Sequence, residues 1–421
     1  MKLSLKNIDY RHRIIEDELR ELLSVRGAVL IEGLKWCGKT TTGQKCSIDN
    51  LSLVDRLTRS RVSAMLDEPE VLFGDKAPFL IDEWQEVPAI WDAIRSNIDT
   101  THAKGKFILT GSISKSRVTE KSHSGTGRIS RILMRTMSLY ESGESTGEVS
   151  LGGLFLGKLN VYGESTLSKT DIARIITRGG WPEALELEAE EANIQAKAYL
   201  EDICNSDSRN VDGHRRSPLK MNKLLRSYAR NVCTEASNAT IENDMGIISA
   251  TTLRDYLLTL EDLFVIEEME AWNPKIRSKT AIRTSNVRYF SEPAIAAAAL
   301  GIDAGGLMKD FETFGFLFEN LAVKDLRIYA QANGAKVSHY RDGAGLECDA
   351  VVWKQNGEFG LVEIKLGGEQ GILEGEEHLL ALEKKLDENH APSFKMILVS
   401  TGNAYRLESG ILVVPIGCLM P

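Results

Sequence analysis

Residues 33–40 read Gly-Leu-Lys-Trp-Cys-Gly-Lys-Thr and match the pattern G-x-x-x-x-G-K-[ST]. The motif follows the apolar run 28–31 and precedes a segment that can begin a helix, so it occupies a strand-to-helix turn. Glycines let the backbone turn tightly, so that successive N–H groups and a helix N-terminus face phosphate oxygens. The motif therefore predicts an α/β fold with a parallel sheet and a phosphate-bearing ligand at its edge. A chance match in a glycine-rich turn is the alternative interpretation.

Each position of the motif has an expected role. Gly33 and Gly38 shape the loop, and Lys39 places a positive charge at the β- and γ-phosphates. Thr40 offers a hydroxyl to Mg²⁺, and Thr41 follows it in the first helical turn as a further phosphate-binding candidate. The motif therefore predicts a nucleotide bound together with Mg²⁺.

Two further apolar runs end in polar residues. The run 79–81 is followed by Asp82 and Glu83, about 40 residues after the loop, where a neighbouring parallel strand would deliver its carboxylates. We expect Asp82 to hold Mg²⁺ and Glu83 to orient and deprotonate an attacking water; capping of the next helix is the alternative. The run 107–109 ends at Thr110-Gly111-Ser112, so Thr110 or Ser112 is a γ-phosphate sensor candidate, or simply part of a strand exit.

An arginine is commonly needed to stabilise the charge on a transferred phosphoryl group. Arg128 is the first choice because it follows the glycine-bearing stretch 124–127, with Arg131 and Arg178 as substitutes. A solvated surface arginine is the alternative for each of them.

The middle of the chain carries a helical pattern and a basic segment. Residues 218–272 read as three helices followed by the short apolar piece 264–266, an order that suits a winged-helix module or a plain helical linker. Residues 205–233 contain seven Lys and Arg against two Asp and Glu. This segment predicts contact with phosphates of duplex DNA, or else a solvated or interdomain surface.

The last third contains a set of carboxylates and a lysine on expected elements. Glu319 lies in a helical pattern, Asp349 in the strand-like stretch 348–353, and Glu363 and Lys365 in the stretch 360–365. Side chains two residues apart on a strand share a face, so Glu363 and Lys365 lie together. The three carboxylates are candidate Mg²⁺ ligands, and Asp349, Glu363 and Lys365 are candidate catalytic residues at a phosphodiester. The alternative is an ordinary solvated Glu-Lys pair.

Charge and composition narrow the remaining functions. The net charge is −9, and residues 301–421 hold 11 Lys and Arg against 18 Asp and Glu. A DNA backbone would be repelled there unless a metal ion neutralised the acids. Six cysteines stand singly without a zinc-binding spacing, and the longest apolar stretch, 294–300, is far below the ~20 residues of a membrane span. We therefore expect a cytoplasmic protein without membrane contact, for which a homo-oligomer is a candidate assembly.

Across essentially the whole chain the order of motifs resembles an AAA-type ATPase of archaea and bacteria, with an uncharacterised domain fused behind it. The motifs that carry the resemblance are GLKWCGKT, FLIDEWQEVP, KFILTGS, Gly127-Arg128, RGGWPEA from Arg178, SEPAIAAAALG, FGFLFENLAVKDL, YRDGAGLECDAVV and LVEIK. One departure is Glu292, where relatives tend to carry Asp, and we assign it no role. The resemblance implies ATP binding and hydrolysis, a winged-helix-like middle, and a carboxyl-terminal fold related to restriction endonucleases, with Asp349, Glu363 and Lys365 in the PD-(D/E)xK pattern.

The expected organisation is an ATPase core at 1–155, a helical and winged-helix-like region at 156–285, and a nuclease-like domain at 286–421. The leading hypothesis is an ATP-hydrolysing switch whose nucleotide state controls a nuclease-like domain, with DNA as its candidate target. One alternative is an ATP-gated DNA- or protein-binding switch with an inactive nuclease fold. Another is a small-molecule kinase, which the Asp82-Glu83 pair and the lack of a lid-like segment disfavour.

Overall fold

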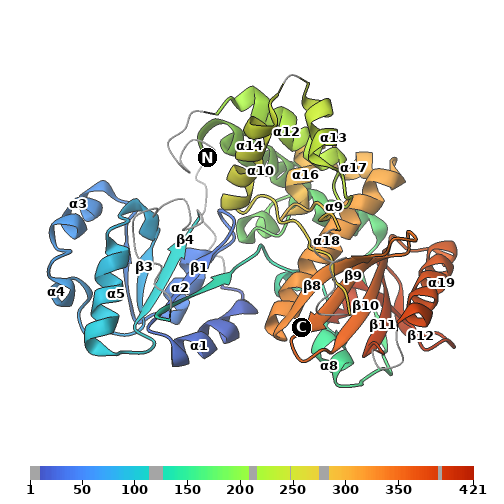
Figure 1. The fold of residues 1–421 in the computed structure, drawn as a ribbon, viewed down its shortest axis with the longest axis horizontal. Coiled ribbons are helices and arrows are strands. Elements are labelled where there is room, and N and C mark those ends of the chain that lie inside the picture. Colours follow the sequence, from blue (N-terminus) through green and yellow to red (C-terminus); the bar gives the residue numbers. More distant parts are fainter. Residues whose placement is uncertain (1–9, 113–126, 208–215, 247, 275–283, 387–390) are drawn as a thin grey trace. The chain divides into compact units, whose positions relative to one another are not determined.

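The computed structural model describes residues 10–112, 127–207, 216–246, 248–274, 284–386 and 391–421 (Figure 1). These residues form two compact units. The amino-terminal unit comprises Met1–Thr136 with Trp181–Glu186 and Asp262–Phe264, and the carboxyl-terminal unit comprises Met137–Gly180, Leu187–Glu261 and Val265–Pro421. The division into three domains with boundaries after residues 155 and 285 stays a prediction.

The amino-terminal unit is built on a five-stranded parallel sheet in the order β2-β3-β4-β1-β5. Its strands are β1 (Ala28–Glu32), β2 (Asp49–Ser52), β3 (Phe79–Asp82), β4 (Phe107–Gly111) and β5 (Ile129–Leu133). Because all strands run the same way, the residues that follow β1, β3 and β4 meet at one edge of the sheet. The predicted parallel α/β sheet is thereby confirmed.

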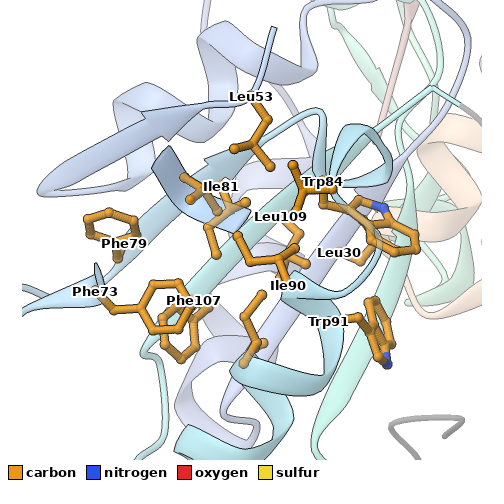
Figure 2. Close-up of a cluster of buried hydrophobic side chains, with 14 of the residues drawn as sticks. Leu30, Leu53, Phe73, Phe79, Ile81, Trp84, Ile90, Trp91, Phe107 and Leu109 are labelled. Carbon is orange, nitrogen blue, oxygen red and sulfur yellow. The ribbon is translucent and has the colours of Figure 1, made fainter. Parts of the chain in front are cut away.

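Helices cover both faces of this sheet. They are α1 (Ile15–Val25), α2 (Lys39–Cys46), α3 (Arg56–Ala64), α4 (Pro69–Phe73) and α5 (Ile90–Thr101). Side chains alternate along β1, so Leu30 faces the cluster with Ile90 and Trp91 of α5, as Figure 2 shows. Val29 and Ile31 face α1 on the other side. The strands are thus buried on both faces, which explains their continuous apolar runs.

The carboxyl-terminal unit contains a seven-stranded mixed sheet in the order β7-β12-β13-β11-β10-β9-β8. Its strands are β7 (Gly163–Glu164), β8 (Ala335–Arg341), β9 (Glu347–Lys354), β10 (Phe359–Lys365), β11 (Phe394–Val399), β12 (Asn403–Arg406) and β13 (Leu412–Pro415). The strands β8, β9 and β10 form an antiparallel meander, β11 pairs in parallel with β10, and β13 pairs in parallel with β11. A separate parallel pair joins β6 (Val149–Ser150) to β14 (Leu419–Met420).

Helices pack against this sheet and form the rest of the unit. The buried helix α18 (Phe311–Ala332) contacts β8, and α19 (Glu369–Lys385) packs on the strands through Leu379 and Leu382. The other helices are α7 (Leu139–Ser142), α8 (Leu151–Phe155), α9 (Lys169–Arg178), α10 (Ala189–Asp202), α12 (Pro218–Arg230), α13 (Asn238–Met245), α14 (Ala250–Asp262), α16 (Pro293–Leu300) and α17 (Ala304–Leu307).

Three helices of the middle region, α12, α13 and α14, are followed by two antiparallel bridges, Ile266 to Phe290 and Met269 to Val287. This is the element order expected from the sequence. Within the described residues, no helix combines the length and apolar character that crossing a membrane requires.

Candidate functional site

The phosphate-binding motif lies in the turn between β1 and α2. Gly38 immediately precedes Lys39, the first residue of α2. Gly33 follows β1 with φ +151°, and a Cβ on it would lie 2.1 Å from the carbonyl oxygen of Met134. Only glycine tolerates this backbone and this approach, so the first glycine of the motif fits the loop against the chain that follows β5.

The side chain of Lys39 is buried within the loop, with 4% of the residue exposed. Its Nζ donates hydrogen bonds to the carbonyl oxygens of Gly33 at 3.0 Å and Leu34 at 2.8 Å. The loop backbone thus holds an ammonium group at the N-terminus of α2, where the helix dipole also favours anions.

Asp82 stands at the end of β3 and accepts three hydroxyl hydrogen bonds. Thr40 Oγ1 donates to Oδ1 at 2.6 Å, Thr110 Oγ1 donates to the same oxygen at 2.7 Å, and Ser52 Oγ donates to Oδ2 at 3.3 Å. The structure therefore brings Thr40 and Asp82 together, as the sequence predicts. A hydroxyl and a carboxylate beside a phosphate loop are the oxygen donors that Mg²⁺ prefers, so these residues fit the ion.

Glu83 lies beside Asp82 and is fixed by its neighbours. Ser112 Oγ donates to Oε1 at 3.0 Å, and Gln85 Nε2 donates to Oε2. The Glu83 backbone has φ 55°, in the left-handed region that non-glycine residues seldom adopt, and its N–H donates to Thr110 Oγ1 at 3.1 Å. Both sensor candidates therefore contact the acidic pair, Thr110 through both residues and Ser112 through Glu83.

Two residues that support the loop were missed by sequence reasoning. The buried Arg13 donates to the carbonyl oxygens of Cys37 at 2.6 Å and Arg135 at 2.8 Å. Trp181, 1% exposed, donates from Nε1 to the carbonyl oxygen of Lys35 at 3.2 Å. Trp181 belongs to the RGGWPEA motif, so the sequence marked it as part of the family resemblance but did not predict its contact with the phosphate loop. Nothing in the sequence pattern around Arg13 marks that residue.

The arginine candidates do not lie at this loop. Arg128 precedes β5 at the amino ends of the strands, where Ala28 N donates to its carbonyl oxygen, and its side chain pairs with Asp99. Five residues of strand, about 16 Å, separate it from the edge that carries the motif. Arg131 is exposed within β5, and Arg178 makes two 2.8 Å hydrogen bonds to Glu144 in the carboxyl-terminal unit. Parallel strands put the two sheet edges far apart, so Arg128 lies away from the loop of its own unit, and the assignment of the arginine stays a prediction.

The predicted acids and lysine of the carboxyl-terminal unit do gather. Lys365 Nζ of β10 lies 3.0 Å from Glu363 Oε2 and 4.0 Å from Asp349 Oδ2 of β9. The backbone N–H of Ile364 donates to Asp349 Oδ2 at 2.7 Å. Glu319 of α18 accepts a 2.6 Å hydrogen bond from the Tyr289 hydroxyl. Glu363 and Lys365 therefore share one face of β10, as the alternation of side chains along a strand predicts.

Burial and mutual repulsion both raise the pKa values of the acids Glu319 and Glu363. Burial raises the pKa of Glu319 well above its ordinary value and also raises the pKa of Glu363, and in both cases the charge of Asp349 adds to the rise. Burial alone would lower the pKa of Lys365, but the two carboxylates beside it raise it to about 12.

The metal site expected at Glu319, Asp349 and Glu363 stays a prediction. Among the described residues, no three His, Cys, Asp or Glu side chains are placed to hold a metal ion together. The physical reason is that the Lys365 ammonium neutralises Glu363 and approaches Asp349, while Glu319 is held by Tyr289. As they lie, these residues do not fit a shared Mg²⁺.

The basic segment 205–233 is only partly a charged surface. Arg209 and Arg215 lie outside the described residues. Arg216 is buried and makes two hydrogen bonds to Asp255, at 2.8 and 3.0 Å, so its charge is already matched. The exposed basic side chains of α12 are those of Lys220, Lys223, Arg226 and Arg230, the last of which pairs with Asp244.

Three family models match the chain. The AAA domain matches residues 25–143, which contain the phosphate loop, the acidic pair and all five strands of the parallel sheet. The fold, the site and this match together support an AAA-type ATPase domain in the amino-terminal unit. Residues 169–305 match "Domain of unknown function (DUF8612)" and residues 314–419 match "Domain of unknown function (DUF4143)".

Two relatives that match most of the chain are distant in sequence. Uncharacterized proteins of Mycobacterium bovis and Mycobacterium tuberculosis are each 22% identical over 355 residues, covering 82% of this chain and 72% of theirs. Among solved structures, a Walker-type ATPase of Pyrococcus abyssi is 14% identical, with 71% of this chain and 98% of that chain covered and a TM-score of 0.44. AMPPCP-bound DnaA from Aquifex aeolicus is also 14% identical, with 59% and 86% covered and a TM-score of 0.29. TM-scores this low do not support any conclusion about the function of this chain.

Proposed function

We propose that the amino-terminal unit binds ATP with Mg²⁺ and hydrolyses it. The observation that carries the proposal is the assembly of Thr40, Asp82 and Glu83 at one sheet edge, directly beside the phosphate loop. Thr40 and Asp82 would hold the ion, which supplies charge neutralisation at the phosphates. Glu83, oriented by Ser112 and Gln85, would accept the proton of the attacking water.

Phosphate binding follows from the loop itself. The backbone N–H groups at the start of α2 and the Lys39 ammonium offer donors to phosphate oxygens. A triphosphate carries formal negative charge, so it is a stronger acceptor for Lys39 than the neutral carbonyl groups of Gly33 and Leu34. Thr41 adds a backbone donor in the same turn.

The test compares two substitutions at this edge. Lys39→Ala should abolish turnover of ATP and weaken nucleotide binding, because the phosphates lose their contact with the buried ammonium group. Glu83→Gln should keep binding and reduce turnover by about 100-fold or more, because an amide cannot take the proton. Phosphate release and equilibrium binding of labelled ATP measure the two effects. Unchanged hydrolysis in both variants would sink the assignment.

For the carboxyl-terminal unit we propose recognition of a nucleic acid or protein rather than cutting. Supporting this, Lys365 pairs with Glu363 and approaches Asp349, so the acids of the PD-(D/E)xK pattern lie as an ion-paired set. Asp349 lies on β9, and Glu363 and Lys365 lie on β10, which supports a nuclease-like fold as the framework. The bridges after α14 likewise support a winged-helix-like middle.

Plasmid incubation with Mg²⁺ or Mn²⁺ separates recognition from cutting. The expected result is a shift of DNA mobility without nicking, in wild type and in Lys365→Ala alike. An exposed change on α12, Lys223→Ala, should weaken the shift if this helix contacts phosphates. Metal-dependent nicking that disappears in Lys365→Ala and Asp349→Ala would instead establish Asp349, Glu363 and Lys365 as catalytic.

A further inference from the structure

Two motifs that the nucleotide site leaves unexplained meet in one buried cluster of charges in the carboxyl-terminal unit. The cluster consists of Glu292, which precedes α16, with Lys324 and Asp325 of α18; they are 0%, 3% and 0% exposed. Lys324 Nζ lies 3.7 Å from Glu292 Oε2 and 3.6 Å from Asp325 Oδ1. Charges are buried this completely only where partners compensate the lost hydration, so their positions are tightly constrained.

The cluster binds backbone at two places far apart in the sequence. Lys324 Nζ donates to the carbonyl oxygen of Met137 at 2.9 Å, and Glu292 Oε2 accepts from the N–H of Gly180 at 3.0 Å. Asp325 Oδ2 accepts from the N–H of Leu139 at 2.9 Å. Every charged group of the cluster thus fixes a main-chain atom near Met137 or Gly180.

These two places are also joined to each other. Met137 N donates to the carbonyl oxygen of Gly180 at 2.7 Å. A Cβ on residue 180 would lie 2.3 Å from the Met137 carbonyl oxygen and 3.1 Å from Lys324 Nζ, so only glycine fits. Met137 and Gly180 stand at two of the places where the chain passes between the carboxyl-terminal and amino-terminal units, and further passages follow Glu186, Glu261 and Phe264.

The residues just beyond both passages support the phosphate loop within the amino-terminal unit. Before Met137, the Arg135 carbonyl accepts from Arg13, which also holds Cys37 of the loop, and Met134 N donates to the Glu32 carbonyl at 2.8 Å. After Gly180, Trp181 Nε1 donates to the Lys35 carbonyl of the loop. Each connection is therefore anchored at one end to the loop and at the other to the charge cluster.

We propose that Glu292 and Lys324 are positioning residues for the nucleotide site. Through the connections at Met137 and Gly180 they link the shape of the phosphate loop to the carboxyl-terminal unit. The inference rests on the proposed function, because a nucleotide is the ligand whose phosphates reshape the loop. Nucleotide binding would then affect both units. A shift of the Lys35 backbone would move Trp181, and Trp181 follows Gly180, whose N–H donates to Glu292.

The experiment measures amide hydrogen exchange of the full chain at Met137, Leu139 and Gly180, with and without MgADP. Two variants break the connection at different ends. Trp181→Phe removes only the indole N–H donor, and the paired change Glu292→Gln with Lys324→Met removes both charges without leaving either unpaired. The matched control is Trp353→Phe, which removes a comparable indole hydrogen bond, to Ser338 at 3.1 Å, inside the carboxyl-terminal unit.

In wild type and in Trp353→Phe, MgADP should slow exchange at these amides about fivefold or more, a usual size for coupling between sites. The nucleotide-dependent change should fall below about twofold in Trp181→Phe and in the paired variant. A purely structural cluster would alter exchange without nucleotide and leave the response to MgADP intact, which would overturn the inference.

Binding of MgADP is measured in parallel for each variant. If the wild-type protein binds MgADP but exchange at these amides does not change, the inference is overturned and the proposed function stands. Wild type that does not bind MgADP overturns both. If the paired variant fails to fold, as circular dichroism would show, the Trp181→Phe response alone decides.

Discussion

At the scale of single residues, burial of Asp325 makes the free energy of unfolding depend on pH. Burial raises the pKa of this carboxyl to about 6; Glu141 and Glu292 add to the rise, whereas Lys324 and the N–H of Leu139 oppose it. The ordinary value in an unfolded chain is about 3.9. Between these values the folded protein binds more protons than the unfolded chain, so the free energy of unfolding should fall as pH rises from about 4 to 6.

Asp325→Asn should remove this dependence, since an amide does not titrate and its oxygen still accepts from Leu139. Relative to wild type, the free energy of unfolding of the variant should rise by about 3 kcal/mol between pH 4 and pH 7, because folding raises the carboxyl pKa by about two. Denaturant unfolding followed at several pH values measures the difference. Parallel curves for the two proteins would contradict the role given to burial.

At the scale of elements, the turn from β1 to α2 depends on Gly33. Gly33→Ala should force the Met134 carbonyl away, because the new Cβ would lie 2.1 Å from it at φ +151°. We expect a loss of stability of about 2 kcal/mol or more and at least tenfold weaker nucleotide binding. Thermal unfolding and ATP binding check both effects. Gly315→Ala in α18 is the matched control, since nothing lies within 4 Å of its Cβ and alanine favours a helix.

Elements also show what sequence alone could predict. The apolar runs at 28–31, 79–81 and 107–109 became β1, β3 and β4 because buried strands are continuously hydrophobic. The helical pattern around Glu319 is α18, and the strand-like stretches 348–353 and 360–365 are β9 and β10. The edge strand β2, Asp-Asn-Leu-Ser, is polar and half exposed, so it lacks the apolar run from which a buried strand can be predicted. The same holds for Arg13 and Glu292, whose partners lie far away in sequence.

At the scale of the whole molecule, the two compact units each have a hydrophobic core. We expect calorimetric unfolding in more than one transition, since chains with several cores depart from two-state behaviour. MgADP at a hundred times its Kd should stabilise the transition of the amino-terminal unit by about 2.7 kcal/mol. Lys39→Ala should remove that shift. A single transition that moves as one with MgADP would show that the units unfold together.

The short segment Trp181–Glu186 packs with the amino-terminal unit although residues of the carboxyl-terminal unit flank it on both sides. The chain therefore cannot be divided into independently expressible halves at one cleavage point. A fragment that stops where the AAA match ends, at residue 143, would lack the indole that lies 1% exposed against the loop and the Glu186 carboxylate 3.5 Å from Arg11. Recombinant production of the isolated amino-terminal unit would need residues 181–186 joined by a short designed linker after Thr136.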